Sequence, residues 1–429
     1  MNNSNDILNN DAKNLEKINL KEYGNYNHLK NDSKESTLNI GFLSNVFFPV
    51  TNGVVHSLHL LAKGLKFLGY NPFLITSKHP RFDDHIIKKY NINYEVITIP
   101  SIYFKKVDYC IPNPLNIFFI DKFIANRKID ILQLNHPFLI YNISKKIKKI
   151  NKNIKKVFVF HTQYDLYHNY VKFIPIELYN KFIWNHINDV VSNVDVVIVP
   201  SKSMINKIKD NIDNKYYQKL VYIPNPVDVD IINNIDLKKV EHLKDELNLK
   251  GKFVLGFIGR IEKEKNLDTL IEFFINNFQS NEEIVLLIVG GGSYLQELKN
   301  KYSNFKNVIF TGKIEFQRIG AYYKLLDVFI SLSLSEVKPL AYLEALTLGV
   351  PIIAFKTIGA DDLIINNYNG FLINPDNNYQ LNLLNIINNL ISNKELLENL
   401  KFNAINSSKE YNYIKISKRY ADLYYDLLK

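Results

Sequence analysis

The sequence predicts an α/β protein with two doubly wound parallel sheets that face each other across a cleft. A chain of 429 residues exceeds what one hydrophobic core usually supports. Short apolar runs alternate with amphipathic segments, the pattern of βαβ units whose strands are buried on both faces. This pattern is interrupted at residues 223–230, "IPNPVDVD", where two prolines restrict the backbone, and then begins again.

The first domain is expected to span residues 38–225. Its first structured segment is expected to be "LNIGFLSNVF", residues 38–47. The apolar residues from Val55 to Leu68 then recur at helical spacing until Gly69 ends the helix. The later strands of this domain are expected at residues 72–76, 94–99, 130–134, 156–160, 194–200 and 220–224.

The second domain is expected to span residues 226–411. Its predicted strands lie at residues 252–259, 284–291, 307–312, 327–333 and 350–355. The segment "ISKRYADLYYDLLK" has the pattern of an amphipathic helix, and residues 412–429 are expected to pack back on the first domain. Residues 1–37 are polar and lack a sustained period, which predicts a disordered N-terminal extension.

The net charge of +10 favours an anionic partner such as nucleic acid, an anionic membrane surface or a phosphorylated ligand. The lysines are not organised within a nucleic-acid-binding motif, so no nucleic acid partner is predicted. No apolar run approaches the roughly 18–20 residues that span a bilayer, and the N-terminus lacks the apolar core of a signal peptide. We therefore expect a cytoplasmic protein, and we make no prediction of its oligomeric state.

Ligands of open α/β sheets bind beyond the carboxyl ends of the strands, so candidate site residues should directly follow strands. In "GRIEKEKN", Arg260 follows a predicted strand and Lys265 lies near the start of a helix. Two cations and a helix N-terminus are suited to a diphosphate. The alternative is a solvated surface turn. Gly290, Gly291 and Gly292 follow the next strand and permit a close approach of the backbone to a ligand.

Two glutamates, Glu336 and Glu344, lie eight positions apart in "SEVKPLAYLEALTLGVPIIA". Glu344 lies between apolar residues, where a carboxylate is costly unless it has a partner. The alternative to a ligand-binding role is structural: Glu336 would be a carboxylate at a helix start, and Glu344 would lie on a solvated helix face. The aspartates at 228–230 and 361–362 lie in the linker and at a helix start, so no metal site is predicted.

The order of these motifs resembles that of the retaining, nucleotide-sugar-dependent glycosyltransferases of family 4. The motifs are "FFPVTNGVVHSLHLLAKGL", "FHTQYDLYHNYV", "VIVPSKSM", "IPNPVDVD", "GRIEKEKN", "FTGKI" and "SEVKPLAYLEALTLGVPIIA". The resemblance as a whole covers residues from about 39 to 425. The resemblance implies the GT-B fold, in which two Rossmann-like domains face a central cleft. It also implies a nucleotide-sugar co-substrate, hexosyl transfer with retention, and no strict requirement for a metal cofactor.

The same resemblance implies a role for each matching residue. Arg260 and Lys265 are expected to neutralise the donor diphosphate. Glu336 is similar to the residue that contacts the donor sugar, and Glu344 to the one that binds the ribose hydroxyls. His161, in "HTQY", resembles the cleft histidine near the transferred sugar. The alternative for a single histidine after a strand is a hydrogen-bonded structural residue.

Two further positions concern the backbone of the expected donor site. By the same resemblance, Gly53 is expected in a loop whose backbone approaches the diphosphate or the acceptor. Family members usually have glycine where this chain has Pro339, and proline removes one N–H that could contact the donor. The amides of Leu340 and Ala341 remain available, and Lys338 could offset the loss with its positive charge.

The motifs "VFFPVTNGVVHSL" and "FHTQYDLYHNYVKFIP" resemble those of diacylglycerol glucosyltransferases, which act at the cytoplasmic membrane surface. This favours transfer of glucose from UDP-glucose to diacylglycerol or a related lipid by a protein bound to the inner face of the membrane. One alternative is the same chemistry on a cell-wall or polysaccharide sugar. The other is a GT-B protein that has lost catalysis and serves as a binding or partner subunit.

A basic segment at residues 140–156 supports the membrane hypothesis. Its lysines, among them Lys145, Lys146, Lys148 and Lys149, alternate with isoleucines at roughly helical spacing. A basic amphipathic helix of this kind can lie on anionic lipid. The alternative is a solvated helix face.

Overall fold

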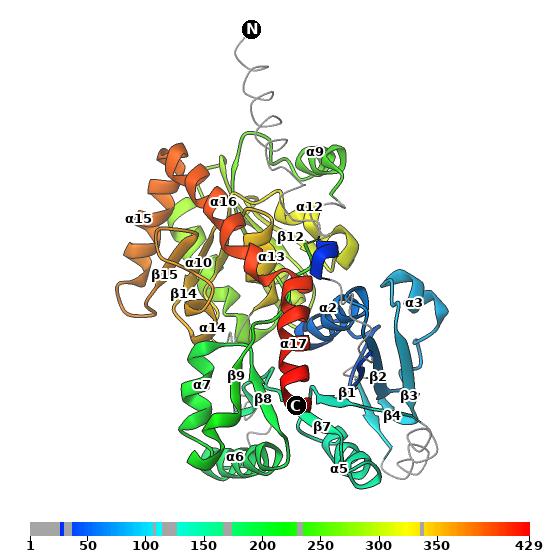
Figure 1. Cartoon of the computed structure of the whole chain (residues 1–429). Coiled ribbons are helices and arrows are strands. Elements are labelled where there is room, and N and C mark those ends of the chain that lie inside the picture. The colour runs from blue at the N-terminus through cyan, green and yellow to red at the C-terminus, as the bar shows by residue number, and fades with distance from the viewer. Residues whose placement is uncertain are drawn as a thin grey trace.

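The chain has the two-sheet α/β architecture that the sequence predicts (Figure 1). The computed structural model describes residues 26–29, 37–105, 109–113, 127–165, 174–229, 235–334 and 339–429. Seven described strands form the first sheet in the order β3-β2-β1-β6-β7-β8-β9, with parallel neighbours. They are β1 (Asn39–Ser44), β2 (Asn71–Ser77), β3 (Glu95–Ile99), β6 (Ile131–Leu134), β7 (Lys155–Val159), β8 (Val196–Val199) and β9 (Leu220–Tyr222).

Helices connect these strands, as parallel pairing requires. The described helical elements of this half are η2 (Tyr26–Leu29), α2 (Gly53–Phe67), α3 (Asp84–Lys89), α5 (Ile140–Ile150), α6 (Ile176–Ser192), α7 (Lys202–Lys209) and η5 (Asn214–Lys219). Two short strands that the sequence did not suggest, β4 (Ser101–Phe104) and β5 (Tyr109–Pro112), pair antiparallel beside the main sheet.

Six described strands form the second sheet, again all parallel, in the order β12-β11-β10-β13-β14-β15. They are β10 (Phe253–Ile258), β11 (Ile284–Val289), β12 (Val308–Gly312), β13 (Val328–Ser331), β14 (Ile352–Phe355) and β15 (Gly370–Ile373). The helical elements of this half are α9 (Leu237–Glu246), η6 (Lys263–Lys265), α10 (Leu267–Phe278), α11 (Leu295–Tyr302), η7 (Phe316–Arg318), α12 (Ile319–Tyr323), α13 (Leu340–Thr347), α14 (Ile358–Asp361), α15 (Tyr379–Ser392), α16 (Lys394–Ser408) and η8 (Lys409–Tyr411).

Apart from β15, which the sequence analysis did not predict, the strands of the two sheets form where the apolar runs predicted them, because helices cover both faces of each sheet. In β11 all six residues are buried, and in β6 all four are buried, including the polar Gln133. Helix α2 begins at Gly53, two residues before the predicted start, because the side chain of Asn52 caps it by accepting a hydrogen bond from the amide of Val55 at 3.0 Å.

The chain crosses between the two halves twice, and the two crossings lie side by side. The amide of Val227 donates to the carbonyl of Tyr411 at 2.8 Å, and the amide of Tyr413 donates back to Val227 at 3.2 Å. After the second crossing, the last helix, α17 (Tyr413–Leu428), leaves the second domain and ends beside the first sheet (Figure 1).

Helix α17 packs closely on α2. The hydroxyl of Ser417 donates to the carbonyl of Leu61 at 3.2 Å. A Cβ atom at Gly64 would lie only 2.2 Å from that hydroxyl, so this glycine lets the two helices approach. The end of the chain is therefore part of the first half of the molecule.

None of the helices among the described residues is both long enough and apolar enough to cross a bilayer.

Candidate active site

A cleft of about 1120 Å³ opens between the two sheets. Its first wall contains residues that directly follow strands of the first sheet, such as Asn45 after β1 and His161 after β7. Its second wall contains Arg260, which closely follows β10, and the start of α13. The site therefore lies at the carboxyl ends of both sheets, where open α/β folds bind ligands.

His161 is half-buried in the first wall. Its Nε2 atom lies 3.1 Å from Oδ1 of Asn135, the residue that follows β6. Burial, reinforced by the neighbouring His136, lowers the pKa of His161 to about 3. The imidazole is therefore neutral at physiological pH and a weak base.

His136 is a second cleft histidine, which the sequence interpretation missed. Burial lowers its pKa to about 4. The amide of Asn45 lies 3.3 Å from its Nδ1 atom and points its N–H at it, so Nδ1 is the acceptor and Nε2 carries the ring proton. The signal was present in the sequence, because "NH" directly follows the predicted strand at residues 130–134.

The predicted cations Arg260 and Lys265 both line the cleft. The side chain of Arg260 is 63% exposed and lies 3.7 Å from the carboxylate of Glu264. Lys265 ends the turn η6, and Asn266, in the left-handed region at φ 55°, precedes α10. The side chain of Asn266 donates to the carbonyl of Leu332 at 3.0 Å and so fixes this turn to the end of β13.

The three glycines after β11 have a packing role. A Cβ atom at Gly290, whose φ is 142°, would lie 1.9 Å from the carbonyl oxygen of Gly259. A Cβ atom at Gly292 would lie 2.1 Å from that of Ile261. The glycines therefore allow this loop to pack against the loop that carries Arg260, which explains the motif without a direct ligand contact.

The start of α13 forms the part of the second wall that faces the first domain. Pro339, Leu340 and Ala341 all line the cleft, with Pro339 at the N-cap position and the helix beginning at Leu340. Across the cleft, Gly53 opens α2, and a Cβ atom there would lie 3.8 Å from Leu340. Two helix N-termini, which carry partial positive charge, therefore face the same space.

Glu344 lies one turn further along α13, on the helix face of Leu340 and Ala341. It is half-buried, and the hydroxyl of Tyr323 donates to its Oε2 atom at 2.8 Å. Burial raises the pKa of Glu344 to about 7, and Asp228 adds to the shift. Glu344 does not itself line the cleft as the structure describes it. Glu336 lies outside the described residues, as does Lys338.

Among the described residues, no three histidine, cysteine, aspartate or glutamate side chains lie in an arrangement that could hold a metal ion. The carboxylate of Asp362 has a capping role instead. It accepts hydrogen bonds from the amide of Lys202 at 2.8 Å and from the hydroxyl of Ser203 at 3.2 Å, at the start of α7 in the other half of the molecule.

The basic segment forms helix α5, but its apolar face is not available to lipid. Ile140, Ile143 and Ile147 are buried against the first sheet. The four predicted lysines lie outside this face: Lys145, Lys146 and Lys148 are half-buried and Lys149 is exposed. These lysines also make contacts within the protein: Lys145 pairs with Asp189 at 3.0 Å, and Lys148 donates to the carbonyl of Ile154 at 2.5 Å.

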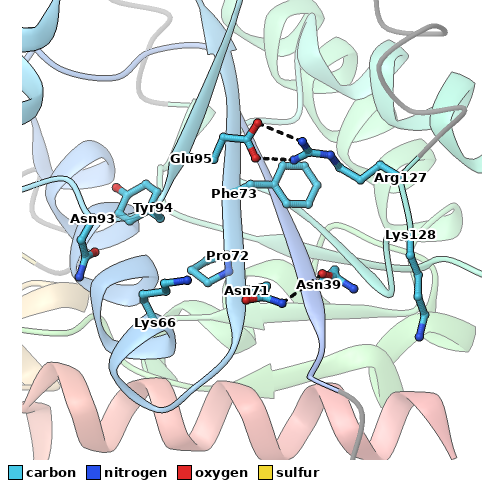
Figure 2. Close-up of a pocket in the computed structure, with 10 residues that line it drawn as sticks. All are labelled: Asn39, Lys66, Asn71, Pro72, Phe73, Asn93, Tyr94, Glu95, Arg127 and Lys128. Atoms are coloured by element: carbon cyan, nitrogen blue, oxygen red, sulfur yellow. Dashed lines mark hydrogen bonds and ion pairs between the residues drawn. The ribbon is translucent and has the colours of Figure 1, made fainter.

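A second hollow, of about 510 Å³, lies at the opposite end of the first sheet (Figure 2). Asn39, Asn71 and Glu95 are the first residues of β1, β2 and β3, and their side chains line it. Figure 2 shows the guanidinium of Arg127 bound to both carboxylate oxygens of Glu95, at 2.6 and 3.0 Å, above the ring of Phe73.

Two facing sheets with a cleft between their carboxyl ends are the architecture of the GT-B class of glycosyltransferases. Comparison with known proteins supports the same class. Residues 51–231 match the family model "Glycosyltransferase Family 4", and residues 239–407 match "Glycosyl transferases group 1". The chain belongs to the glycosyltransferases that combine these two domains, and it is a nucleotide-sugar-dependent enzyme.

Similar proteins include an alpha-monoglucosyldiacylglycerol synthase from Acholeplasma laidlawii, which is 27% identical over 91% of this chain and 98% of its own. A synthase of the same name from Streptococcus pneumoniae is 27% identical over 78% of this chain and 75% of its own. Among solved structures, Anabaena HepE in complex with UDP-glucose superimposes with a TM-score of 0.72 at 17% identity, over 91% of this chain and all of that one.

Proposed function

We propose that the protein transfers glucose from UDP-glucose to diacylglycerol, with retention of the anomeric configuration, at the surface of a membrane. The observation that carries this proposal is the cleft itself. One wall of the cleft contains the two cations Arg260 and Lys265 and the start of α13. The opposite wall contains the neutral imidazole of His161. The two similar diacylglycerol synthases support the choice of acceptor, and the UDP-glucose complex with the same fold supports the choice of donor.

In the proposed donor site, the diphosphate lies between Arg260, Lys265 and the first amides of α13. Departure of the nucleoside diphosphate develops negative charge on the phosphate oxygens. Preorganised cations and N–H groups stabilise that charge without a metal ion. Because Pro339 has no N–H, the amides of Leu340 and Ala341 are the proposed donors at this helix start.

The remaining donor contacts come from the two glutamates. We assign the donor sugar to Glu336 and the ribose hydroxyls to Glu344. The ionised carboxylate of Glu344 is the stronger acceptor for hydrogen bonds from both hydroxyls, and its pKa of about 7 leaves it divided between the two forms near neutral pH. Donor binding should therefore be linked to the loss of a proton from this group.

In the proposed reaction, the acceptor hydroxyl attacks the anomeric carbon from the face that the phosphate leaves. The bond from that carbon to the phosphate oxygen breaks, the new glycosidic bond forms on the same face, and the acceptor proton passes to the leaving phosphate. A histidine with a pKa of about 3 is a poor proton acceptor, so the phosphate is the better base. His161 is assigned to hydrogen bonding near the transferred sugar.

Membrane binding is assigned to the first domain. Three of the four isoleucines of α5 are buried and only Ile150, at the end of the helix, is exposed, so its lysines would act mainly through charge. Apolar contact would come from the neighbouring helix α6, where the exposed fractions of Ile176, Leu178 and Phe182 are 50, 60 and 65%. Helices α5 and α6 are adjacent, because the hydroxyl of Tyr141 donates to the carbonyl of Asp189 at 3.1 Å.

The transfer reaction is tested by incubating the purified protein with radiolabelled UDP-glucose, with and without vesicles of phosphatidylglycerol that contain diacylglycerol. We expect labelled lipid only when diacylglycerol is present. Transfer only to soluble sugars would overturn the lipid acceptor and favour a cell-wall or polysaccharide sugar. Absence of both donor turnover and donor binding would overturn the whole proposal.

Membrane binding is tested by sedimentation with the same vesicles. Replacing Lys145, Lys146, Lys148 and Lys149 by serine should release most of the protein. The matched control removes four positive charges from exposed positions of the second half: Lys238, Lys239, Lys250 and Lys394. Equal sedimentation of the α5 variant and the control would contradict a role for the lysines of α5.

A further inference from the structure

A continuous series of hydrogen bonds connects the last helix of the chain with His161 in the cleft. The hydroxyl of Tyr424, on α17, donates to Oε1 of Gln133 at 2.5 Å. The amide nitrogen of Gln133 donates to Oδ1 of Asn135 at 3.1 Å, and the same oxygen lies 3.1 Å from Nε2 of His161. Tyr424, Gln133 and Asn135 are at most 1% exposed, so water does not compete for these bonds.

The backbone of β1 fixes the direction of every bond in this series. The carbonyl of Leu43 can only accept, and the side-chain nitrogen of Asn135 lies 3.3 Å from it. The Oδ1 atom of Asn135 must therefore point toward both Gln133 and His161. It follows that Gln133 presents its nitrogen to Asn135 and its oxygen to Tyr424, and that the Nε2 atom of His161 carries the ring proton.

This arrangement decides what His161 can offer to a ligand. Burial keeps the ring neutral, so it carries a single N–H, and Asn135 already accepts that N–H. The other nitrogen, Nδ1, keeps its lone pair. A ring held in this way accepts a hydrogen bond from a hydroxyl group, whereas the other tautomer would donate one.

We propose that Asn135, Gln133 and Tyr424 are positioning residues for transfer, which hold His161 in its Nε2-protonated tautomer so that Nδ1 accepts a hydrogen bond from a hydroxyl of the donor sugar or the acceptor. The last helix, α17, lies far from His161 in the sequence, yet it would thereby help to position a residue of the active site. This assignment rests on the proposed function, because it takes His161 as a residue that faces the reacting groups.

The tautomer is measured directly by long-range ¹⁵N–¹H NMR spectroscopy of the ring nitrogens, with His161 assigned by comparison with the His161→Ala variant. This measurement needs no substrate, so it remains decisive if the transfer assay fails. We expect a protonated Nε2 and an unprotonated Nδ1 in the wild-type protein at pH 7. A protonated Nδ1 would overturn the proposed positioning.

The contribution of α17 is measured with Tyr424→Phe, which removes one hydroxyl and leaves Oε1 of Gln133 buried without its donor. We expect kcat to fall by roughly three- to tenfold, the effect of one lost hydrogen bond, with KM for UDP-glucose within about twofold. The control is Tyr420→Phe on the same helix, a fully buried tyrosine whose ring lies 6.0 Å from that of Tyr424. It should change kcat by less than about twofold.

A merely structural effect is separated by a double-mutant cycle with His161→Ala. If Tyr424 acts through His161, Tyr424→Phe should change kcat by less than about twofold once the imidazole is absent. An equal loss of kcat with and without His161, or an equal loss in the Tyr420→Phe control, would overturn the proposal. If the wild-type enzyme transfers no sugar, the proposed function fails, whereas the tautomer measurement still tests the positioning of His161.

Discussion

The first sheet has one hollow at the amino ends of its strands and the cleft at their carboxyl ends, and an arginine lines each of them. The two arginines are bound differently. At the amino ends of the strands, both carboxylate oxygens of Glu95 bind Arg127, at 2.6 and 3.0 Å (Figure 2). At the carboxyl ends, Arg260 is 63% exposed and lies 3.7 Å from its partner Glu264. A short bidentate pair satisfies its own charges, whereas a long pair in a cleft can exchange its partner for a ligand. The chemistry is therefore expected in the cleft alone.

The largest expected effect is the difference in kcat between variants of the two arginines, Arg260 in the cleft and Arg127 in the second hollow. Arg260→Ala should lower kcat by about 10² to 10³, because it removes a preorganised cation from the leaving diphosphate. The matched control, Arg127→Ala, removes the same side chain from the other hollow and should leave kcat within about twofold. Steady-state kinetics with UDP-glucose measure both variants. A comparable loss of kcat in both variants would remove the distinction between the two hollows.

The next largest effect concerns the pH dependence of donor binding. The pKa of Glu344 is raised to about 7, so its carboxylate form is fully present above this pH and is lost as the pH falls through it. If the ribose requires the carboxylate, the dissociation constant of UDP-glucose should rise about tenfold from pH 8 to pH 6. The cleft histidines His136 and His161, with pKa values of about 4 and about 3, do not titrate in this range.

Calorimetric titration with UDP-glucose at both pH values measures this effect, because a diphosphate esterified at both ends does not itself titrate there. Glu344→Gln cannot ionise, so it should bind the donor weakly at pH 8 and with little change at pH 6. The assignment of Glu344 to the ribose fails if this variant keeps the pH dependence of the wild type.

The smallest effect is expected in the second hollow. Glu95→Gln breaks an ion pair whose side chains are 30 and 50% exposed, so the loss should be only about 0.2–1 kcal/mol. This corresponds to a decrease in melting temperature of at most about 4 °C, and it should shrink at high salt. Transfer activity should not change. A large loss of activity in this variant would show that the second hollow has a functional role.

The fold was predictable because strands buried on both faces leave continuous apolar runs in the sequence, as in "IVLLIV" of β11. The hairpin of β4 and β5 was missed, because two short strands with half-exposed residues leave no such run. Arg260, Lys265 and His161 could be found because each lies shortly after a strand, and the structure places all three in one cleft.

Other parts of the site could not be found in this way. The bond between Tyr424 and Gln133 joins positions 291 residues apart, and neither residue belongs to a motif. Tyr323, which donates to Glu344, likewise becomes a neighbour only when α12 packs against α13. The glycines after β11 were interpreted as a ligand loop, although they are needed because a neighbouring backbone lies too close for a side chain at Gly290.

The most direct measurement of the central claim is a crystal structure of the protein with bound UDP. The diphosphate is expected between the guanidinium of Arg260 and the first amides of α13, and the ribose hydroxyls within hydrogen-bonding distance of Glu344. The hollow that contains Arg127 should hold no nucleotide. A nucleotide bound in that hollow, or a diphosphate that contacts neither Arg260 nor the start of α13, would contradict this account of the cleft.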